Sequence, residues 1–563
     1  MNTSNPSVLV IGGSYAGLHA AELLAQQLPS HWSVTLVERN THFNHVYSFP
    51  RSAVTGLAHR NFIPYTGKLN KLNNHISSPE ERSSSSSSSS TNLNPRIRLI
   101  NASVTKIVDR KVFLDRMVDL HPDSSSSVHE SIIHNNLADS PAGSVFTDSG
   151  YASSLDSKNS PAAKKPDHQL TSSRSIEQIG AHPHSHPAPQ RTAQVGWDFL
   201  VYALGSHMPM PLHLPIDQHR SKTNGVAFLE AQKAAIAKAE KIVIVGGGAL
   251  GIQYACDIAH RYQLLGAPKH VTLIHSRAAF LPSFKPEIDQ KVKQALDGFG
   301  VHVVLGERVN LTKLKADIEL QKERGSGKVV VESLSNEGNR WEADLVLTCT
   351  GQIPNTSLMA QFCPLAVHGG MRNQEGSSGL IRVNRGLQIS PSRLGPSPVE
   401  TPTGAQAACE CGFASLQISR PTLPTNKQRD ENPAWKRVFA IGDCIDGFGA
   451  IKAGHVGWNQ AEVAARNILA SIAHLERKSL GAGHQSVDLD EVQLEHYLPT
   501  PPMIKLTLGL HRVVTQLRSS DNPDQVVVAE KTIVPDGDQG AAWRDMWSRY
   551  DLVDEDQILD GWA

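Results

Sequence analysis

Near its N-terminus the chain reads Val8-Leu-Val-Ile-Gly12-Gly13-Ser14-Tyr15-Ala16-Gly17, and this stretch decides the fold. The apolar run predicts a buried strand, and the glycines permit a tight turn in which backbone N–H groups closely approach a pyrophosphate. The residues from about Tyr15 onward predict a helix, whose N-terminal dipole favours an anion. We therefore predict a dinucleotide site whose pyrophosphate is bound by the whole turn, Gly12, Gly13, Ser14, Tyr15, Ala16 and Gly17.

An acidic residue follows this turn at the spacing expected for ribose recognition. Residues 33–38 read Ser-Val-Thr-Leu-Val-Glu and predict a second strand, which ends at Glu38. A carboxylate about 20 residues after the turn is well placed to accept hydrogen bonds from ribose hydroxyls. The alternative is that Glu38 only caps the next turn, and the spacing favours the ribose. Ser14 replaces the central glycine of the motif, and its small side chain still permits close approach of the ligand.

A second glycine-rich turn follows about 230 residues later, in the stretch Lys241-Ile-Val-Ile-Val-Gly246-Gly247-Gly248-Ala249-Leu250-Gly251. Here Gly246, Gly248 and Gly251 give the complete GxGxxG spacing after an apolar strand. Two such turns in one chain suggest two bound dinucleotides, typically a flavin and a nicotinamide. This pair predicts a two-electron relay.

The strand after the second turn, residues 270–275, ends at His275 without an acid, and Ser276 and Arg277 follow. A carboxylate at this strand end selects NAD(H), whereas its absence beside an arginine accommodates the 2′-phosphate of NADP(H). We place His275 and Arg277 in the cofactor site and expect NADPH rather than NADH. The alternative is an exposed turn arginine and use of both nucleotides.

Three further buried strands are predicted at residues 199–205, 345–351 and 438–443; the first two stretches end in a glycine and the third ends in Gly442-Asp443. We place these glycines, Gly205, Gly351 and Gly442, beside the cofactors. The alternation of strands and helices predicts an α/β fold with two Rossmann-like dinucleotide-binding domains and a small C-terminal α+β segment.

The order of these motifs predicts that one domain is inserted in the other. We expect the nicotinamide domain at residues 239–350 and the C-terminal segment at residues 496–563. The FAD domain would then comprise residues 1–119, a connection at 196–238, and residues 351–495.

Some tracts do not follow this pattern. Residues 83–90 are all serine, and residues 120–195 are rich in Ser, Pro, His and Asn without apolar periodicity. Such segments cannot bury enough apolar surface to offset the entropy of ordering, so we predict disordered insertions there. Residues 391–433 form a third loop insertion. A His-rich stretch at residues 182–186 lacks neighbouring acidic or Cys ligands, so we predict no specific metal site.

Composition narrows the class of protein. The 54 basic and 54 acidic residues give a net charge of zero, which does not favour nucleic acid or an anionic membrane. Six cysteines in 563 residues are no disulfide framework, so we expect a reducing compartment, the cytoplasm. No apolar run reaches the roughly 18 residues of a spanning helix.

Trp543 and Trp547 share a helical face, which we expect to pack on the protein itself or on a homodimer partner, while peripheral membrane contact is less favoured.

Further motifs resemble one family of flavoproteins. They are the stretches at residues 41–46, 50–56, 61–65, 271–276 and 438–444, the last reading Val-Phe-Ala-Ile-Gly-Asp-Cys. Together with the two turns they resemble the apoptosis-inducing-factor-like (AMID, ferroptosis-suppressor type) FAD-dependent NAD(P)H oxidoreductases. The resemblance implies a glutathione-reductase-like fold, with FAD in the first site and NADPH or NADH in the second.

The resemblance also assigns roles to single residues. It implies that Arg51 approaches FAD, that Val104 lines the adenine pocket, and that Asp443 binds the ribityl or pyrophosphate region. For Asp443 the alternative is a helix N-cap, because a helix is predicted at residues 453–469. Lys452 aligns with a lysine beside the flavin ring, where a cation stabilises negative charge. The alternative for Lys452 is a solvated loop residue.

Two departures limit the chemistry. The family usually carries a glutamate two residues after the last glycine of the second turn, at the nicotinamide–flavin junction, and this chain has Gln253. A glutamine can hydrogen-bond a carboxamide but cannot act as a base, and hydride transfer needs none. No cysteine precedes Cys256, so the redox-active CxxxxC of disulfide reductases is missing. The remaining acceptors are a quinone, dioxygen or a conjugated metabolite.

Three functions follow as hypotheses. The first is an FAD-dependent NAD(P)H oxidoreductase that reduces a quinone or a similar small acceptor, with Lys452 and Gln253 at the reacting centre. The second is a biosynthetic oxidase or reductase of secondary metabolism on the same scaffold. The third is a non-catalytic flavin-bound signalling protein, and the zero net charge counts against a nucleic-acid partner for it.

Overall fold

The computed structural model describes residues 5–75, 96–119, 191–208, 211–214, 220–325, 327–335, 338–368, 379–391, 433–481, 488–522, 524–532 and 541–549. Apart from Asp119, these residues belong to one compact unit, which comprises residues 1–118 and 191–563. The serine tract, the His-rich stretch and most of the two other predicted insertions lie outside the described residues.

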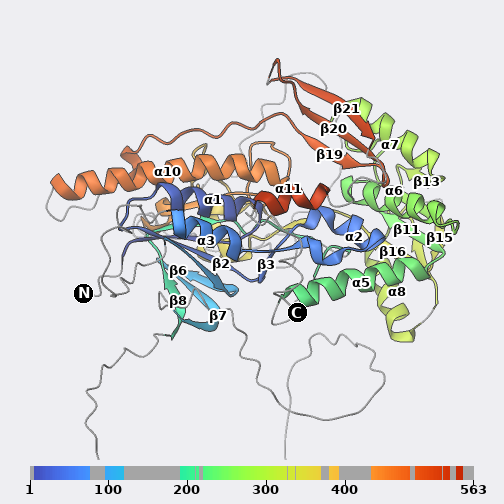
Figure 1. Cartoon of the computed structure of the whole chain (residues 1–563), viewed down its shortest axis with the longest axis horizontal. Coiled ribbons are helices and arrows are strands. Elements are labelled where there is room, and N and C mark those ends of the chain that lie inside the picture. Colours follow the sequence, from blue (N-terminus) through green and yellow to red (C-terminus); the bar gives the residue numbers. More distant parts are fainter. Residues whose placement is uncertain are drawn as a thin grey trace, which may run out of the picture. The chain divides into compact units, whose positions relative to one another are not determined.

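The first sheet has five parallel strands in the order β18-β9-β1-β2-β5. They are β1 (Ser7–Ile11), β2 (Ser33–Glu38), β5 (Ile97–Asn101), β9 (Phe199–Tyr202) and β18 (Val438–Ala440). From Val8 to Ile11 the side chains of β1 are fully buried, as expected for a central parallel strand covered on both faces. The helices α1 (Tyr15–Gln27) and α10 (Gly454–Gly481) pack against each other beside this sheet (Figure 1).

The second sheet has four parallel strands in the order β13-β12-β11-β16. They are β11 (Lys241–Val245), β12 (His270–His275), β13 (His302–Leu305) and β16 (Leu345–Thr348). The helices of this part are α6 (Ala249–Leu264), α7 (Pro286–Gly298) and α8 (Leu311–Arg324), and an antiparallel hairpin joins β14 (Val329–Glu332) to β15 (Arg340–Ala343). The strands of the first sheet therefore come from chain segments that precede and follow the second sheet in the sequence.

The two passages of chain between the sheets pair with each other. β10 (Ser206–His207) follows β9, β17 (Ile353–Pro354) follows β16, and they form an antiparallel pair. A separate three-stranded sheet contains β6 (Val104–Val108), β7 (Lys111–Asp119) and β8 (Arg191–Gly196). The prediction of an insertion up to residue 195 was wrong at its end, because β8 begins at Arg191 and is held by this sheet.

Short elements connect these parts. Between β2 and β5 lie β3 (His42–Asn44), η1 (Val46–Ser48), α2 (Phe49–Thr55), η2 (Ala58–Asn61), β4 (Phe62–Pro64) and α3 (Thr66–His75). The others are α5 (Lys222–Lys238), α9 (Ser357–Phe362), η4 (Pro364–Ala366), η7 (Pro433–Arg437) and η8 (Leu489–Glu491). Phe49 and Ala53 of α2 are fully buried in one apolar core with Ile252 and Tyr254 of α6. The N-terminal segment therefore reaches across to the second nucleotide unit.

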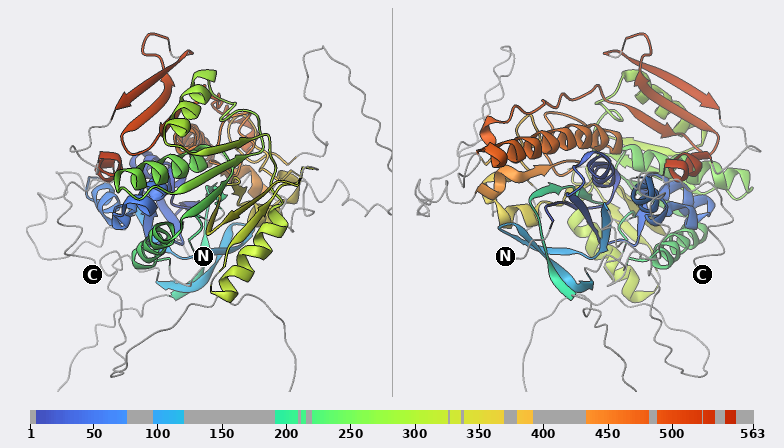
Figure 2. Two further views of the ribbon diagram at one scale, coloured as in Figure 1. Left: turned by 90° about the vertical axis from the view of Figure 1, so that its right-hand side faces the viewer. Right: turned by 60° about the vertical axis from the view of Figure 1, so that its left-hand side comes forward.

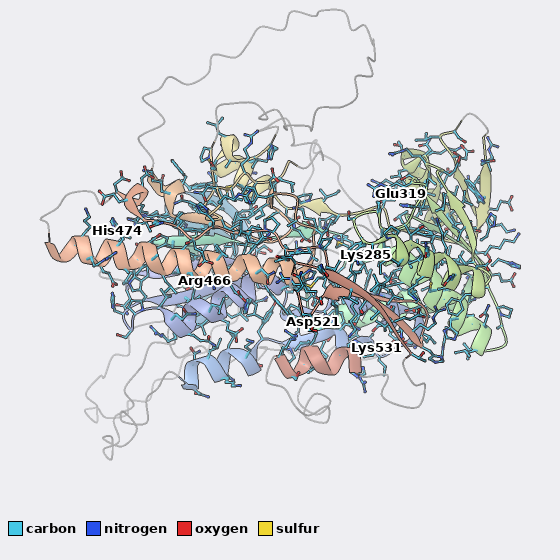
Figure 3. All side chains as sticks on the ribbon, turned by 90° about the horizontal axis from the view of Figure 1, so that it is seen from above. Lys285, Glu319, Arg466, His474, Asp521 and Lys531 are labelled. Carbon is cyan, nitrogen blue, oxygen red and sulfur yellow. The ribbon has the colours of Figure 1, made fainter. Side chains whose placement is uncertain are left out.

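The C-terminal segment is an antiparallel sheet of β19 (Ile504–Thr507), β20 (Arg512–Arg518) and β21 (Val526–Thr532), followed by α11 (Ala541–Arg549). Leu506 and Val514 are fully buried in the core that contains α6 and α7. The N–H of Lys285, at the start of α7, donates to Gln516 of β20 at 2.8 Å, where Figure 3 shows the sheet beside this helix. The strand β20 was missed by the sequence analysis.

Helix α11 packs on the protein's own surface. Trp543 and Trp547 are 3% and 6% exposed, and their indole N–H groups donate to Asn61 Oδ1 and to the carbonyl of Arg60. Both views in Figure 2 place this helix beside the N-terminal helices. The expected packing of the two tryptophans on the protein is confirmed. Among the described residues, no helix is both long enough and apolar enough to cross a bilayer.

Candidate functional site

The first glycine-rich turn has a backbone that favours glycine. Gly12 has a φ of +96°, in the left-handed region. A Cβ there would lie 2.5 Å from the carbonyl oxygen of Ala203, just after β9. A Cβ on Gly17 would lie 1.8 Å from the carbonyl oxygen of Gly12, so α1 can approach the turn only because this residue has no side chain.

The second turn repeats this arrangement contact by contact. Gly246 has a φ of +112°, and a Cβ there would lie 2.2 Å from the carbonyl oxygen of Cys349, just after β16. A Cβ on Gly251 would lie 1.9 Å from the carbonyl oxygen of Gly246. Both turns therefore hold a helix N-terminus against the carboxyl end of a central parallel strand.

Both helix N-termini suit an anionic ligand. The N-cap residues are Ser14 for α1 and Gly248 for α6; neither makes a side-chain cap hydrogen bond, and neither first helical turn contains an acid. A Cβ on Gly248 would meet no atom within 4 Å, so no contact within the described chain requires a glycine there. The N–H groups of a first helical turn have no acceptor within the helix, which suits a pyrophosphate at each turn, and the open space beside Gly248 suits one at the second turn.

Glu38 ends β2 as predicted and is 7% exposed. Its Oε2 accepts the N–H of Gly13 at 2.5 Å, and its Oε1 accepts the N–H and the side-chain N–H of Asn40, both at 2.8 Å. The hydroxyl of Tyr65 donates to the carbonyl of Gly13 at 2.9 Å, so the turn is held on both sides. Glu38 does cap the next turn. Its predicted hydrogen bond from a ribose hydroxyl would use the lone pairs of the carboxylate oxygens that these bonds leave free.

His275 has the place in the second unit that Glu38 has in the first. Its Nδ1 accepts the N–H of Gly247 at 3.1 Å, just as Glu38 accepts the N–H of Gly13. The imidazole also stacks on Phe280, with ring centroids 5.6 Å apart and an interplanar angle of 10°. The histidine therefore replaces the acid in the hydrogen bond that fixes the turn.

Burial and a neighbouring cation keep the His275 imidazole uncharged. Burial lowers the pKa of His275, the nearby Arg277 lowers it further, and the backbone of Ala279 raises it in part. The imidazole is neutral at pH 7 as a result. A 2′-phosphate would meet no carboxylate from this residue, which agrees with the expected use of NADPH.

Arg51 has contacts that differ from those expected. Its Nε and Nη2 form a bidentate pair with Asp257 of α6, at 2.7 and 3.0 Å, and Asp257 is fully buried. Nη2 also donates to the carbonyl of Gly509 at 2.9 Å, and Nη1 lies 3.4 Å from that of Leu510. Arg51 thus joins α2, α6 and the β19–β20 turn, and this arrangement gives no support to its predicted approach to FAD.

Gly442 and Asp443 lie just after β18. Gly442 has a φ of +84°, and its N–H donates to Gln460 of α10 at 2.7 Å. Burial raises the pKa of the Asp443 carboxyl, while Lys452 and a hydrogen bond from Gln352 lower it. The alternative role of Asp443 as the N-cap of the following helix was wrong, because α10 begins at Gly454.

Lys452 precedes α10 and bonds to the protein itself. Its Nζ donates to the carbonyl of Ile445, although the side chain as a whole is exposed. Partial burial lowers the pKa of the ammonium group, and the neighbouring Asp443 opposes this by raising it. The lysine and the carboxylate are therefore electrostatic neighbours at the start of α10, and the flavin contact of Lys452 stays a prediction.

Gln253 lies on the first turns of α6 and reaches the C-terminal sheet. Its Nε2 donates to Thr507 Oγ1 at 3.1 Å. This leaves Oε1 as a hydrogen-bond acceptor. Thr507 was not predicted as a site residue, since it lies 254 positions away in the chain and carries no motif.

The remaining predicted residues lie at strand ends. Val104 begins β6, two residues after Ala102, whose N–H donates to the carbonyl of Glu38 at 3.1 Å. Gly205 and Gly351, with φ of +57° and +110°, lie just before β10 and β17. Their contacts with cofactors stay predictions.

An aromatic cluster beside the first turn was also missed. Tyr15 opens α1, and its ring packs against Phe43 and Tyr47, with centroids 4.9 and 5.0 Å apart. Its hydroxyl forms a 2.8 Å hydrogen bond with His45 Nδ1. The stretch at residues 41–46 contains this histidine and was noted only for its resemblance to a family.

Comparison with known proteins agrees with this geometry. The model of the pyridine nucleotide-disulphide oxidoreductase family matches residues 160–388. The chain is 31% identical over 557 residues to Fe-regulated protein 8 of Mycosarcoma maydis, covering 98% of this chain and 96% of that protein. It is 30% identical over 192 residues to ferroptosis suppressor protein 1 of Homo sapiens, covering 34% and 46% of the two chains.

Among solved structures, the sulfide:quinone oxidoreductase of Aquifex aeolicus has the same fold, with a TM-score of 0.50 and 12% identity over 97% of this chain and 89% of that chain. The full-length similarity to one relative, the family match and the two equivalent turns agree. The chain belongs to the apoptosis-inducing-factor-like, FAD-dependent branch of the pyridine nucleotide-disulphide oxidoreductases, with FAD and NAD(P)H as its cofactors.

Proposed function

We propose that the protein passes a hydride from NADPH or NADH to FAD and then delivers electrons to a quinone or a similar small acceptor. The observation that carries this proposal is the pair of equivalent glycine turns, each followed by an uncapped helix N-terminus. We assign FAD to the turn at residues 12–17 and NAD(P)H to the turn at residues 246–251. Bound FAD supplies the two-electron chemistry, while the chain supplies orientation and an electrostatic field.

On the FAD side, the proposal gives three acidic or basic groups a task. Glu38 accepts hydrogen bonds from ribose hydroxyls, and Asp443 accepts them from the ribityl or pyrophosphate region. Lys452 places positive charge near the flavin ring, where it stabilises negative charge. Burial raises the pKa of Asp443, and the neighbouring Lys452 partly opposes this, so the lysine favours the ionised form that would accept these hydrogen bonds.

On the nucleotide side, we assign the NADPH preference to the neutral His275 together with Arg277. We assign the nicotinamide carboxamide to Gln253, whose Oε1 is an acceptor for the carboxamide N–H. The hydrogen bond from Gln253 Nε2 to Thr507 supports this orientation, because it directs the amide nitrogen to Thr507 and leaves Oε1 as the acceptor.

The cysteines support a small acceptor rather than a disulfide. No cysteine precedes Cys256, and Cys256 and Cys349 are buried single thiols. Burial raises the pKa of both thiols well above the usual range, so neither is a ready nucleophile.

The glutamine at position 253 favours a second candidate, reduction or oxidation of one biosynthetic metabolite instead of quinones in general.

Anaerobic stopped-flow tests the proposal by following flavin absorbance near about 450 nm after mixing with NADPH or NADH. Fast bleaching with one nucleotide supports the reductive step and identifies the preferred nucleotide. Added quinones should then reoxidise the flavin. Absence of bleaching with either nucleotide, in protein that contains FAD, refutes the proposal, and a strong preference for one metabolite over quinones favours the second candidate.

A matched pair of variants on α6 tests the site itself. Gln253→Ala removes the side chain assigned to the carboxamide and should slow bleaching roughly tenfold, the equivalent of one lost hydrogen bond of about 1.4 kcal/mol. Gln263→Ala, in the last turn of the same helix, removes a bond from its Nε2 to the carbonyl of Phe299. It should leave the bleaching rate unchanged. Equal effects of the two variants would refute the assignment of Gln253.

A further inference from the structure

Tyr15 and His45 form a hydrogen-bonded pair inside an aromatic cluster. The Tyr15 hydroxyl oxygen lies 2.8 Å from His45 Nδ1. The Tyr15 ring meets Phe43 edge to face, at an interplanar angle of 81°, and packs obliquely on Tyr47. These contacts on three sides fix the orientation of the hydroxyl toward the imidazole.

The backbone around His45 is also fixed. Its N–H donates to the carbonyl of Asn61 at 2.8 Å, and the N–H and hydroxyl of Ser48 both donate to its carbonyl. Asn61 is fully buried, and its side chain receives the Trp543 bond from α11. The His45 imidazole therefore has little freedom to move away from Tyr15.

His45 is neutral over the whole physiological range. Burial lowers its pKa to about 4, and the positive charge of Lys505 on β19 contributes to this. The titratable groups around the ring are Tyr15 on α1, Tyr47 on η1 and Lys505 on β19. A neutral imidazole has one N–H donor and one acceptor nitrogen, so it can take a proton at one nitrogen as it releases another.

The cluster lies between the two chain segments assigned to FAD. Tyr15 lies within the first glycine turn, residues 12–17, and is the first residue of α1. The hydroxyl of Tyr47 accepts the N–H of Gly454, the first residue of α10 and two positions after Lys452. A Cβ on Gly454 would lie 3.0 Å from the Tyr15 ring, which places both tyrosines against the start of this helix. Tyr15 is partly exposed, whereas His45 is buried behind it.

We propose that Tyr15 and His45 form a proton relay for the electron acceptor. This proposal rests on the proposed function and adds the source of one proton. Two-electron reduction of a quinone-type acceptor needs two protons and two electrons, and the hydride of NAD(P)H supplies both electrons and one proton. The second proton passes from the Tyr15 hydroxyl to an acceptor oxygen.

The relay balances without a lasting charge on the protein. As the Tyr15 O–H bond breaks, its oxygen takes the proton of His45 Nδ1–H. His45 takes a proton from solvent at Nε2 in turn. The imidazole has then changed tautomer, and return of its proton to Nδ1 through solvent restores the starting state.

The test separates the acceptor step from the nucleotide step. Holoprotein reduced with dithionite is mixed with a soluble quinone, so no nucleotide is needed. Tyr15→Phe keeps the aromatic ring and removes the hydroxyl, and it should slow reoxidation by roughly 100-fold, as expected for loss of a positioned proton donor. The rate of flavin bleaching by NAD(P)H should also be measured, and the factor by which it falls should be at least ten times smaller than the factor for reoxidation. The solvent deuterium isotope effect on reoxidation should be present in the wild type and lost in the variant.

Tyr47→Phe is the matched control in the same cluster. It removes a hydroxyl bonded to a backbone N–H rather than to His45, so its reoxidation rate should stay within about threefold of the wild type. His45→Gln should show the same split as Tyr15→Phe. An equal slowing by the two tyrosine variants, or no slowing by Tyr15→Phe, would overturn the relay.

A spectroscopic readout tests the pair without turnover. In ¹⁵N-histidine NMR of the oxidised holoprotein, the signal that His45→Gln removes identifies this ring among the 26 histidines. In the wild type this ring should become protonated only near pH 4, and Tyr15→Phe should change its tautomer ratio at neutral pH. An unchanged ratio would refute the hydrogen bond on which the relay depends. Failure of NAD(P)H to bleach the flavin would refute the proposed nucleotide step alone, because dithionite bypasses it.

Discussion

The choice between NADPH and NADH gives the sharpest prediction, through the variant His275→Glu. In the first unit Glu38 accepts the N–H of Gly13, and in the second unit His275 accepts the N–H of Gly247. A glutamate at position 275 can therefore keep the turn in place, as Glu38 does, while it adds a negative charge. We expect this variant to lose NADPH and to retain NADH.

The size of the effect follows from Coulomb's law. A carboxylate about 6 Å from a doubly charged 2′-phosphate costs about 1.4 kcal/mol at the dielectric constant of water and about 2.8 kcal/mol at half that value. The ratio of kcat/KM for NADPH to that for NADH should therefore fall roughly 10- to 100-fold. His275→Gln is the matched control, because its amide oxygen accepts the same N–H without a charge, and it also removes the stacking on Phe280.

The assay measures flavin reduction at varied NADPH and NADH for the wild type and both variants. His275→Gln should change the ratio by less than about threefold, which is less than 0.7 kcal/mol. An equal loss of NADPH preference in both variants would mean that the imidazole itself, and not the missing charge, selects the nucleotide. A wild type that prefers NADH would refute the reasoning outright.

Three further predictions concern stability. Asp257→Asn should destabilise the fold by about 3–5 kcal/mol in urea denaturation, because it breaks the buried pair with Arg51, whereas Glu230→Gln breaks an exposed pair and should cost less than about 1 kcal/mol. The pKa of His45 is about 4 in the folded chain against 6.5 in the unfolded one, so the unfolded chain binds more protons between these values. Stability should fall as pH falls from 6.5 to about 4, by up to about 3 kcal/mol from this residue, and His45→Gln should flatten that slope. Trp543→Ala should cost about 3–5 kcal/mol and speed hydrogen exchange in α11; unchanged exchange would show that the indole does not hold this helix.

Local sequence was sufficient for the nucleotide units. Strand β2 has the predicted bounds, and α1 begins at the predicted Tyr15. These elements are predictable because an apolar run followed by closely spaced glycines has few other folded solutions. Helix α10, in contrast, runs to Gly481, well beyond the predicted end at residue 469.

Antiparallel strands and distant side-chain partners were not predictable in the same way. The strand β20 pairs with β19 and β21, and the register depends on neighbours rather than on a sequence motif. Arg51 pairs with Asp257 across 206 positions and so links α2 to α6, a contact separate from its predicted approach to FAD. No pattern near either residue indicates that contact.

The sequence by itself determined the two turns, since the backbone at Gly12 and Gly246 has a positive φ and leaves no room for a Cβ. Only the tertiary structure decided which side chains meet at those turns. Gln253 faces Thr507, and Tyr15 faces His45, because packing of separate segments brings them within hydrogen-bond distance. The physical reason is range: a turn is fixed by the sterics of adjacent residues, whereas a hydrogen bond between distant residues depends on every packed element between them.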